Sequence, residues 1–173
     1  MSVPHYHRMS ELGMVVPNVE LIRGALVEKM SQSPLHASIV ELLREYLTVV
    51  LPEECFLRQE KPLTLSDSEP EPDLAVVPGA RRDFLAAHPT SALLIIEVAV
   101  SSEALDRVKL DLYAEAGVQE CWLVLAEERV VERHTEPQGS HFRHVERVCF
   151  PASLESTVWP GLFLPPAELF PER

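Results

Sequence analysis

The sequence lacks the features that mark secreted, membrane-spanning and zinc-binding proteins. Its three cysteines (Cys55, Cys121 and Cys149) are odd in number, widely spaced and form no CxxC pair, so neither a disulfide framework nor a zinc site is predicted. No apolar run approaches the roughly 20 residues of a membrane span. Residues 1–14 hold no apolar segment after a basic start, so we expect no secretion signal. These absences favour a cytoplasmic protein without a membrane anchor.

Positive charge is also scarce. With 15 Lys and Arg against 27 Asp and Glu, the formal net charge is −12. This balance argues against a protein that coats nucleic acid, because phosphate binding calls for a basic surface. It does not exclude a nuclease, whose metal-binding carboxylates add negative charge at the site itself. Any contact with DNA would then need a local basic patch and divalent ions.

Length and hydrophobic periodicity predict one α+β domain. A chain of 173 residues can bury a sizeable core as a single domain. We place this domain over residues 19–173, after an N-terminal arm over 1–18 that is irregular or a short helix. The predicted elements are, in order, a hairpin over 19–22 and 25–28, a helix from Ser33 to Pro52, strands over 55–65 and 72–77, a short helix over 81–87, a strand over 92–100, a helix over 102–116, a strand over 121–125, a hairpin over 130–134 and 141–148, and a packed loop over 159–164 that ends in a short helix near Leu169.

One carboxylate stands inside the most apolar of these segments. Residues 92–100 read ALLIIEVAV, which is typical of a strand buried on both faces. Burying an ionised Glu97 there without a partner is costly, so we expect it to be paired or to bind a cation. Short links join this strand to the following helix and the next apolar strand, which predicts a right-handed parallel crossover.

The helix over 102–116 is predicted to point a lysine at the sheet. At about 100° per residue, with Leu105 at zero, Val108 falls at about 300° on the apolar stripe and Lys109 at about 40°, inside the same stripe. Either Lys109 lies at the rim with its ammonium in solvent, or it reaches Glu97. Asp106, at about 100°, lies at the edge of this face.

Asp73 heads the strand over 72–77 and is the second acid beside an apolar run. Alone, it fits a turn residue after proline. Together with Glu97 on a neighbouring strand, it forms a carboxylate pair that repels unless a cation lies between the two groups. Oxygen ligands with open water positions suit Mg²⁺ or Mn²⁺. Such a metal activates water and stabilises charge on a phosphate oxygen, and an inward Lys109 can orient that water.

The order of these motifs resembles the Uma2 family over nearly the whole chain. The residues that carry the resemblance are Pro72-Asp73, Glu97-Val98, Asp106-Arg107-Val108-Lys109 and the block from Tyr113 to Val124. That family is assigned to the PD-(D/E)XK nuclease fold. The resemblance therefore implies a restriction-endonuclease-like mixed central sheet flanked by helices, with DNA as substrate, Mg²⁺ or Mn²⁺ as cofactor and a homodimer as the assembly. It implies Asp73 and Glu97 as metal ligands and Lys109 as the residue that positions the attacking water.

Several positions depart from the pattern of the family. The glutamate that follows the hairpin glycine is Ala25 in this chain, and Glu28 is a candidate substitute. The family reads Glu-Val-Leu-Ser-Pro-Ser where this chain reads EVAVSS from Glu97, and the acid expected after Val124 is Leu125. His36 matches a family histidine and is either an accessory site residue, as Asp106 is, or a capping and packing residue.

Three hypotheses stay open. The first is a metal-dependent endonuclease that hydrolyses phosphodiester bonds in DNA. The second is a catalytically degenerate protein of the same fold that serves as a binding or assembly module, which the net charge of −12 and the altered site surroundings motivate. The third is that Glu97 and Lys109 form an ion pair that only supports the core.

Overall fold

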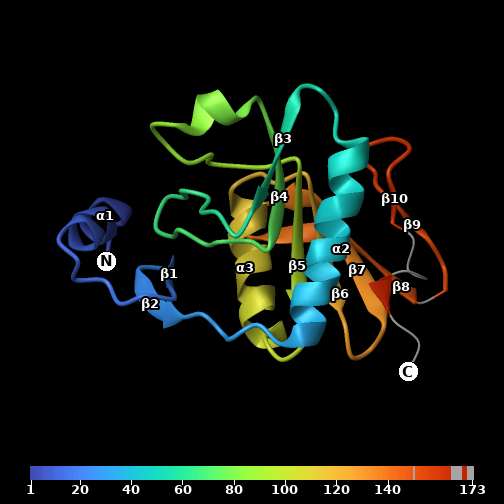
Figure 1. Ribbon diagram of the computed structural model, residues 1–173, viewed down its shortest axis with the longest axis horizontal. Helices are drawn as coiled ribbons and strands as arrows, with labels where there is room; N and C mark the ends of the chain where they lie inside the picture. Colours follow the sequence, from blue (N-terminus) through green and yellow to red (C-terminus); the bar gives the residue numbers. More distant parts are fainter. Residues whose placement is uncertain (150, 165–168, 171–173) are drawn as a thin grey trace.

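A six-stranded mixed sheet forms the centre of the computed structural model, which describes residues 1–149, 151–164 and 169–170 (Figure 1). Its strands follow the spatial order β3-β4-β5-β6-β7-β8. They are β3 (Cys55–Gln59), β4 (Leu74–Pro78), β5 (Leu94–Ala99), β6 (Glu120–Leu125), β7 (Val130–Gln138) and β8 (His141–Cys149). The β5 and β6 strands are parallel neighbours, whereas every other neighbouring pair is antiparallel.

Two helices cover opposite faces of this sheet. The α2 helix (Pro34–Val50) lies on one face and α3 (Glu103–Glu115) on the other (Figure 1). Successive residues of a strand point to opposite faces, and in β5 the residues Leu94 and Ile96 join the cluster beneath α2, while Ile95 and Ala99 join the cluster beneath α3. The same alternation directs Glu97 toward α3.

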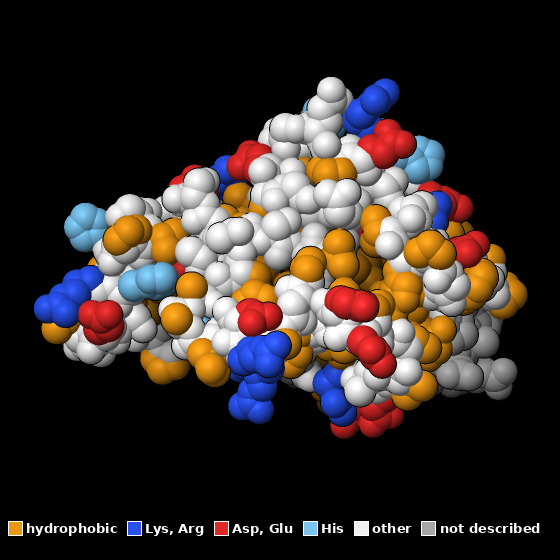
Figure 2. Space-filling model, turned by 90° about the horizontal axis from the view of Figure 1, so that it is seen from above, with side chains coloured by type: hydrophobic (Ala, Val, Ile, Leu, Met, Phe, Trp, Pro, Cys, Tyr) orange, Lys and Arg blue, Asp and Glu red, His pale blue; other side chains and the backbone are white. Residues whose placement is uncertain are grey.

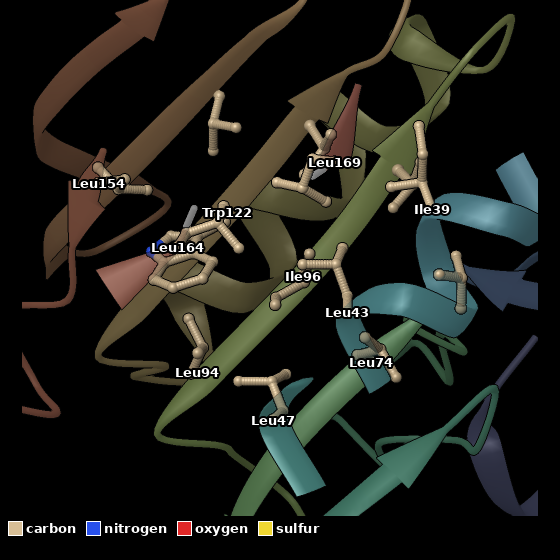
Figure 3. Close-up of a cluster of buried hydrophobic side chains, with 14 of the residues drawn as sticks. Ile39, Leu43, Leu47, Leu74, Leu94, Ile96, Trp122, Leu154, Leu164 and Leu169 are labelled. Carbon is tan, nitrogen blue, oxygen red and sulfur yellow. The ribbon is translucent and has the colours of Figure 1, made fainter. Parts of the chain in front are cut away.

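The start and the apolar face of α2 follow from its sequence. The Ser33 hydroxyl accepts a hydrogen bond from the His36 backbone N–H at 3.2 Å, and Pro34 occupies the first turn, where it loses no helical hydrogen bond. Figure 3 shows apolar side chains of α2 directed at β4, β5 and Trp122 of β6, which form one buried cluster. Pro52 follows the last helical residues, as predicted.

The β5, α3 and β6 elements form the predicted crossover between parallel strands. Leu94 to Ala99 pair in register with Glu120 to Leu125. Gly117 follows the helix with a left-handed φ of 70°, and the next backbone N–H, of Val118, bonds back to the Tyr113 carbonyl oxygen at 3.0 Å. This cap ends α3 at the residue that the glycine predicts.

The N-terminal segment forms a small unit beside the sheet. It consists of α1 (Val3–Glu11) and an antiparallel hairpin of β1 (Val19–Ile22) and β2 (Ala25–Glu28). The hairpin is the predicted one, and residues 1–18 contain the short helix that was one of their two alternatives. A single bridge, between Leu21 and Glu69, joins β1 to the segment that leads into β4. In Figure 1 this unit lies at one side of the sheet, toward α3.

Several elements differ from the sequence prediction, among them β7, which runs to Gln138 instead of ending at residue 134. The β3 strand ends at Gln59 instead of running to residue 65, because Glu60 turns the chain with a left-handed φ of 49°. The short helix predicted over 81–87 is a single 3₁₀ turn over Arg81–Phe84. A further antiparallel pair, β9 (Leu154–Glu155) with β10 (Phe163–Leu164), was not predicted.

Two other expectations concern the helix near the C-terminus and membrane-spanning segments. The short helix predicted near Leu169 adjoins residues 165–168, which lie outside the described residues. None of the helices in the described part of the chain combines the length and the apolar composition of a membrane span.

Candidate active site

Asp73, Glu97 and Lys109 line one pocket at the end of β5. The first residues of both large helices also line it, through the N-caps Ser33 of α2 and Ser102 of α3. The fold therefore brings together Asp73 just before β4, Glu97 of β5 and Lys109 of α3, together with the positive ends of two helix dipoles.

Asp73 and Glu97 are held side by side by two hydrogen bonds to the backbone. Leu74 pairs with Ile96 in the antiparallel ladder, so the preceding Asp73 lies opposite Glu97. The Asp73 N–H donates to Glu97 Oε2 at 3.3 Å, and the Val98 N–H donates to Asp73 Oδ2 at 2.7 Å. Each carboxylate is thus fixed by the backbone of the other strand.

Glu97 is buried in surroundings that are short of positive charge. Its side chain is 2% exposed, and Oε1 accepts a hydrogen bond from the Tyr113 hydroxyl at 2.6 Å. Burial raises the pKa of Glu97 well above its usual range, although Lys109 opposes this rise. The carboxylates of Asp73 and Asp106 raise this pKa further. A cation bound beside Glu97 would relieve both the desolvation and the repulsion.

Lys109 is buried between two carboxylates. Its side chain is only 7% exposed, and Nζ lies 3.1 Å from the carboxylate of Glu20 and 3.5 Å from Glu97 Oε1. Burial lowers the pKa of Lys109, but the charges of Glu97 and Glu20 outweigh burial and raise it. The ammonium therefore reaches Glu97, and the alternative of a solvated lysine at the rim does not hold.

The buried face of α3 differs from the predicted stripe. Val108, assigned to the apolar side, is 43% exposed, whereas Leu110 is buried. Asp106 and Lys109 are both buried as well, so the centre of the buried face lies about 90° round the helix from Leu105. Apolar periodicity does not predict this orientation, because α3 directs polar side chains toward the pocket.

Glu20 is a pocket residue that the sequence analysis did not single out. It lies in β1, is 2% exposed and lines the pocket. Its Oε1 accepts hydrogen bonds from the Glu71 backbone N–H at 3.0 Å and from Lys109 Nζ at 3.1 Å. The available signal is of the same kind as for Glu97 but weaker, namely a carboxylate within the short apolar strand VELI.

The three accessory candidates have different positions. His36 Nε2 lies 3.2 Å from Asp73 Oδ2, and its buried Nδ1 has no hydrogen-bond partner among the described residues. Burial lowers the pKa of His36, but the hydrogen bond with Asp73 outweighs burial and raises it. Asp106 lines the pocket and accepts a hydrogen bond from the Ser102 hydroxyl at 2.5 Å. Glu28 is exposed on β2 and does not line the pocket.

The donor set of the pocket fits a magnesium-type ion. Within the described residues, no group of three or more His, Cys, Asp and Glu side chains forms a metal cage. Mg²⁺ does not need such a cage, because it keeps several waters and takes one or two protein carboxylates. Asp73 and Glu97 supply two adjacent carboxylates, and the raised pKa of Glu97 indicates that Lys109 alone leaves this acid undercompensated.

The mixed sheet, its two flanking helices and the acidic pocket define a nuclease-like α+β protein. The fold is similar to the crystal structure of a putative nuclease belonging to DUF820 from Anabaena variabilis ATCC 29413, with a TM-score of 0.75 and 21% sequence identity over 94% of this chain and 96% of that chain. This likeness confirms the predicted fold class.

The family assignment comes from the sequence itself. The model of the Uma2 family, described as "Putative restriction endonuclease", matches residues 3–167. The chain belongs to the Uma2 family, as the motifs around Asp73, Glu97 and Lys109 predict. No curated protein matches the sequence.

Proposed function

We propose that this protein is a metal-dependent endonuclease that hydrolyses phosphodiester bonds in DNA. The observation that carries the proposal is the convergence of Asp73, Glu97 and a buried, charged Lys109 on one pocket. Membership of the Uma2 family supports the nuclease class and a nucleic acid as the substrate.

In the proposed mechanism Asp73 and Glu97 would hold Mg²⁺ or Mn²⁺. The bound ion supplies an activated water and stabilises negative charge on the phosphate. Lys109 keeps its proton because of the neighbouring carboxylates, so its ammonium can orient the attacking water and stabilise the developing charge. His36 and Tyr113 hold the carboxylates of Asp73 and Glu97 in place through their hydrogen bonds.

The charge of the molecule sets a condition on this function. The face drawn in Figure 2 carries basic and acidic side chains interspersed, and the net charge of the chain is −12. We expect divalent ions to be required for DNA binding as well as for hydrolysis, because the acidic surface and pocket repel phosphates.

Cleavage of a supercoiled plasmid tests the proposal. We expect the purified protein to nick the plasmid with Mg²⁺ or Mn²⁺ and not with EDTA. Asp73→Asn, Glu97→Gln and Lys109→Met should each reduce the rate by roughly a hundredfold or more, which is the loss typical of removing one charge-stabilising group. Asp111→Asn, which changes an exposed acid of α3, is the matched control and should keep the activity. Activity that survives Glu97→Gln would exclude this mechanism.

The second candidate is a degenerate module of the same fold for binding or assembly. The net charge of −12 and the departures at Ala25 and Leu125 favour it. Calorimetric titration with Mn²⁺ separates the two, because a folded protein that binds no metal at millimolar concentration supports the module. If Glu97 and Lys109 only support the core, then their joint replacement by apolar residues should be tolerated. The predicted homodimer and cytoplasmic location remain predictions.

A further inference from the structure

The Lys109 ammonium is shared unequally between two buried carboxylates. Nζ lies 3.1 Å from the Glu20 oxygens and 3.5 Å from Glu97 Oε1. Among the described residues these are the two carboxylates within ion-pair distance of Lys109. All three side chains are at most 7% exposed, so solvent and salt screen their attraction little.

Glu20 is fixed independently of Lys109. Its backbone lies in the β1–β2 ladder, where Glu20 faces Val27. Its Oε1 also accepts the hydrogen bond from the Glu71 N–H at 3.0 Å. The carboxylate therefore stays in the pocket whether or not the ammonium is present, and it provides a fixed negative charge on the side of the N-terminal hairpin.

Glu97 is the carboxylate for which two cations can compete. A lysine ammonium drawn fully onto Glu97 would neutralise a carboxylate that a divalent ion also needs. The Tyr113 hydroxyl already occupies Oε1 of Glu97 at 2.6 Å, and Asp73 lies beside Oε2. Which cation Glu97 carries then depends on where Lys109 is held.

We propose that Glu20 is a positioning residue that holds the Lys109 ammonium on the hairpin side of the pocket and so leaves the Glu97 carboxylate available to a divalent metal ion. This inference rests on the proposed function, because it takes Asp73 and Glu97 as the metal ligands. It assigns to the N-terminal hairpin a role in metal affinity without a contact with the metal.

A double-mutant cycle on Mn²⁺ affinity, measured by calorimetry on the full chain, tests the inference. In the wild type, Glu20→Gln should raise the Kd for Mn²⁺ about tenfold, because Lys109 then pairs with Glu97. In the Lys109→Met background the same substitution should leave the Kd unchanged within about twofold. An equal rise in Kd in both backgrounds would show that Glu20 acts as a direct ligand. An unchanged Kd in the wild-type background would show that Glu20 has no positioning role. Either result overturns the inference.

Two further variants control for the loss of a buried acid beside the hairpin and for misfolding of Glu20→Gln. Glu69→Gln is the matched control, because Glu69 is also a buried acid beside the hairpin but pairs with His7 at 2.6 Å and does not line the pocket. It should leave Mn²⁺ affinity unchanged. If Glu20→Gln does not fold, Glu20→Asp keeps the charge but draws it back from Lys109, and it should also raise the Kd in the wild-type background alone.

The cycle also distinguishes failure of the inference from failure of the proposed function. Wild-type protein that binds no Mn²⁺, or whose binding survives Asp73→Asn, contradicts the metal site and with it the role of Glu20. Binding that Asp73→Asn abolishes, without coupling between positions 20 and 109, contradicts the positioning role alone.

Discussion

Glu97 and Glu132 are two buried glutamates with opposite electrostatic surroundings. Glu132 of β7 is 3% exposed and accepts a pair of hydrogen bonds from the Arg107 guanidinium at 2.9 and 3.1 Å and another from Arg147 at 2.8 Å. Burial alone would raise the pKa of Glu132, but Arg107 and His134 outweigh burial and lower it. Burial raises the pKa of Glu97, where the cations are fewer. The contrast distinguishes an acid that stabilises the fold from one that stays available for a ligand.

The two acids should respond oppositely to loss of charge. In EDTA at pH 7.5 we expect Glu97→Gln to stabilise the protein, because an amide avoids the cost of ionising a buried carboxylate whose pKa is raised in the folded state. We expect Glu132→Gln to cost roughly 1.5 to 3 kcal/mol, the range for hydrogen bonds to charged groups. Urea unfolding measures both. A destabilised Glu97→Gln protein would show that Glu97 is fully compensated without metal.

The pH dependence of these two effects follows from the signs of the shifts. The folded-state pKa of Glu132 lies below the ordinary value of 4.5, so its stabilisation is present above that value and is lost as the pH falls through the folded-state pKa. The loss of unfolding free energy in Glu132→Gln should therefore become smaller below about pH 4.5. The folded-state pKa of Glu97 is raised, so ionisation costs stability as the pH rises, and the gain of Glu97→Gln should disappear in acid.

At this scale the sequence identifies Glu97 more readily than Glu20. A carboxylate inside a long apolar run has to be explained by a partner or a ligand. Glu20 stands in a strand of four residues that the hairpin pattern allows to be half exposed. Its partner Lys109 is 89 residues away along the chain, so only the docking of the hairpin against α3 reveals the contact.

Among the elements, the first turn of α2 carries both a cap and a pocket residue. Ser33 bonds to the His36 N–H, and the His36 side chain reaches Asp73. We expect Ser33→Ala to cost about 1 kcal/mol of unfolding free energy, as lost caps do, and Ser33→Asp to cost little. Urea denaturation of both variants measures this. An equal loss in the two variants would mean that the cap hydrogen bond is not what stabilises this turn.

The elements also show where periodicity succeeds and fails. The β5–α3–β6 crossover is predictable, because two apolar strands joined by a helix with short links have few other arrangements. The orientation of α3 is not, because Asp106 and Lys109 count as polar although the fold buries them. Val108 is wrongly assigned to the buried face for the same reason, because the charged side chains that face the pocket interrupt the apolar periodicity of α3.

For the molecule as a whole, the N-terminal hairpin and the central sheet are joined by few backbone contacts. Leu21 is fully buried, whereas its ladder partner Leu26 is 38% exposed. We expect Leu21→Ala to cost about 2 to 5 kcal/mol locally and to accelerate amide exchange in β1 and β2, while β5 and β6 stay protected. Leu26→Ala is the control and should change little. Equal acceleration across β5 and β6 would show that the hairpin and the sheet open as one unit.

The separation of 89 positions between Glu20 and Lys109 also has a consequence for synthesis on the ribosome. The hairpin emerges first, whereas Lys109 of α3, whose ammonium Glu20 contacts, is synthesised much later. A chain whose translation stops between residues 97 and 109 contains Glu20, Asp73 and Glu97 but lacks Lys109. Such incomplete chains carry three acids of the pocket without the residue proposed to position water, so we expect them to lack the proposed nuclease activity.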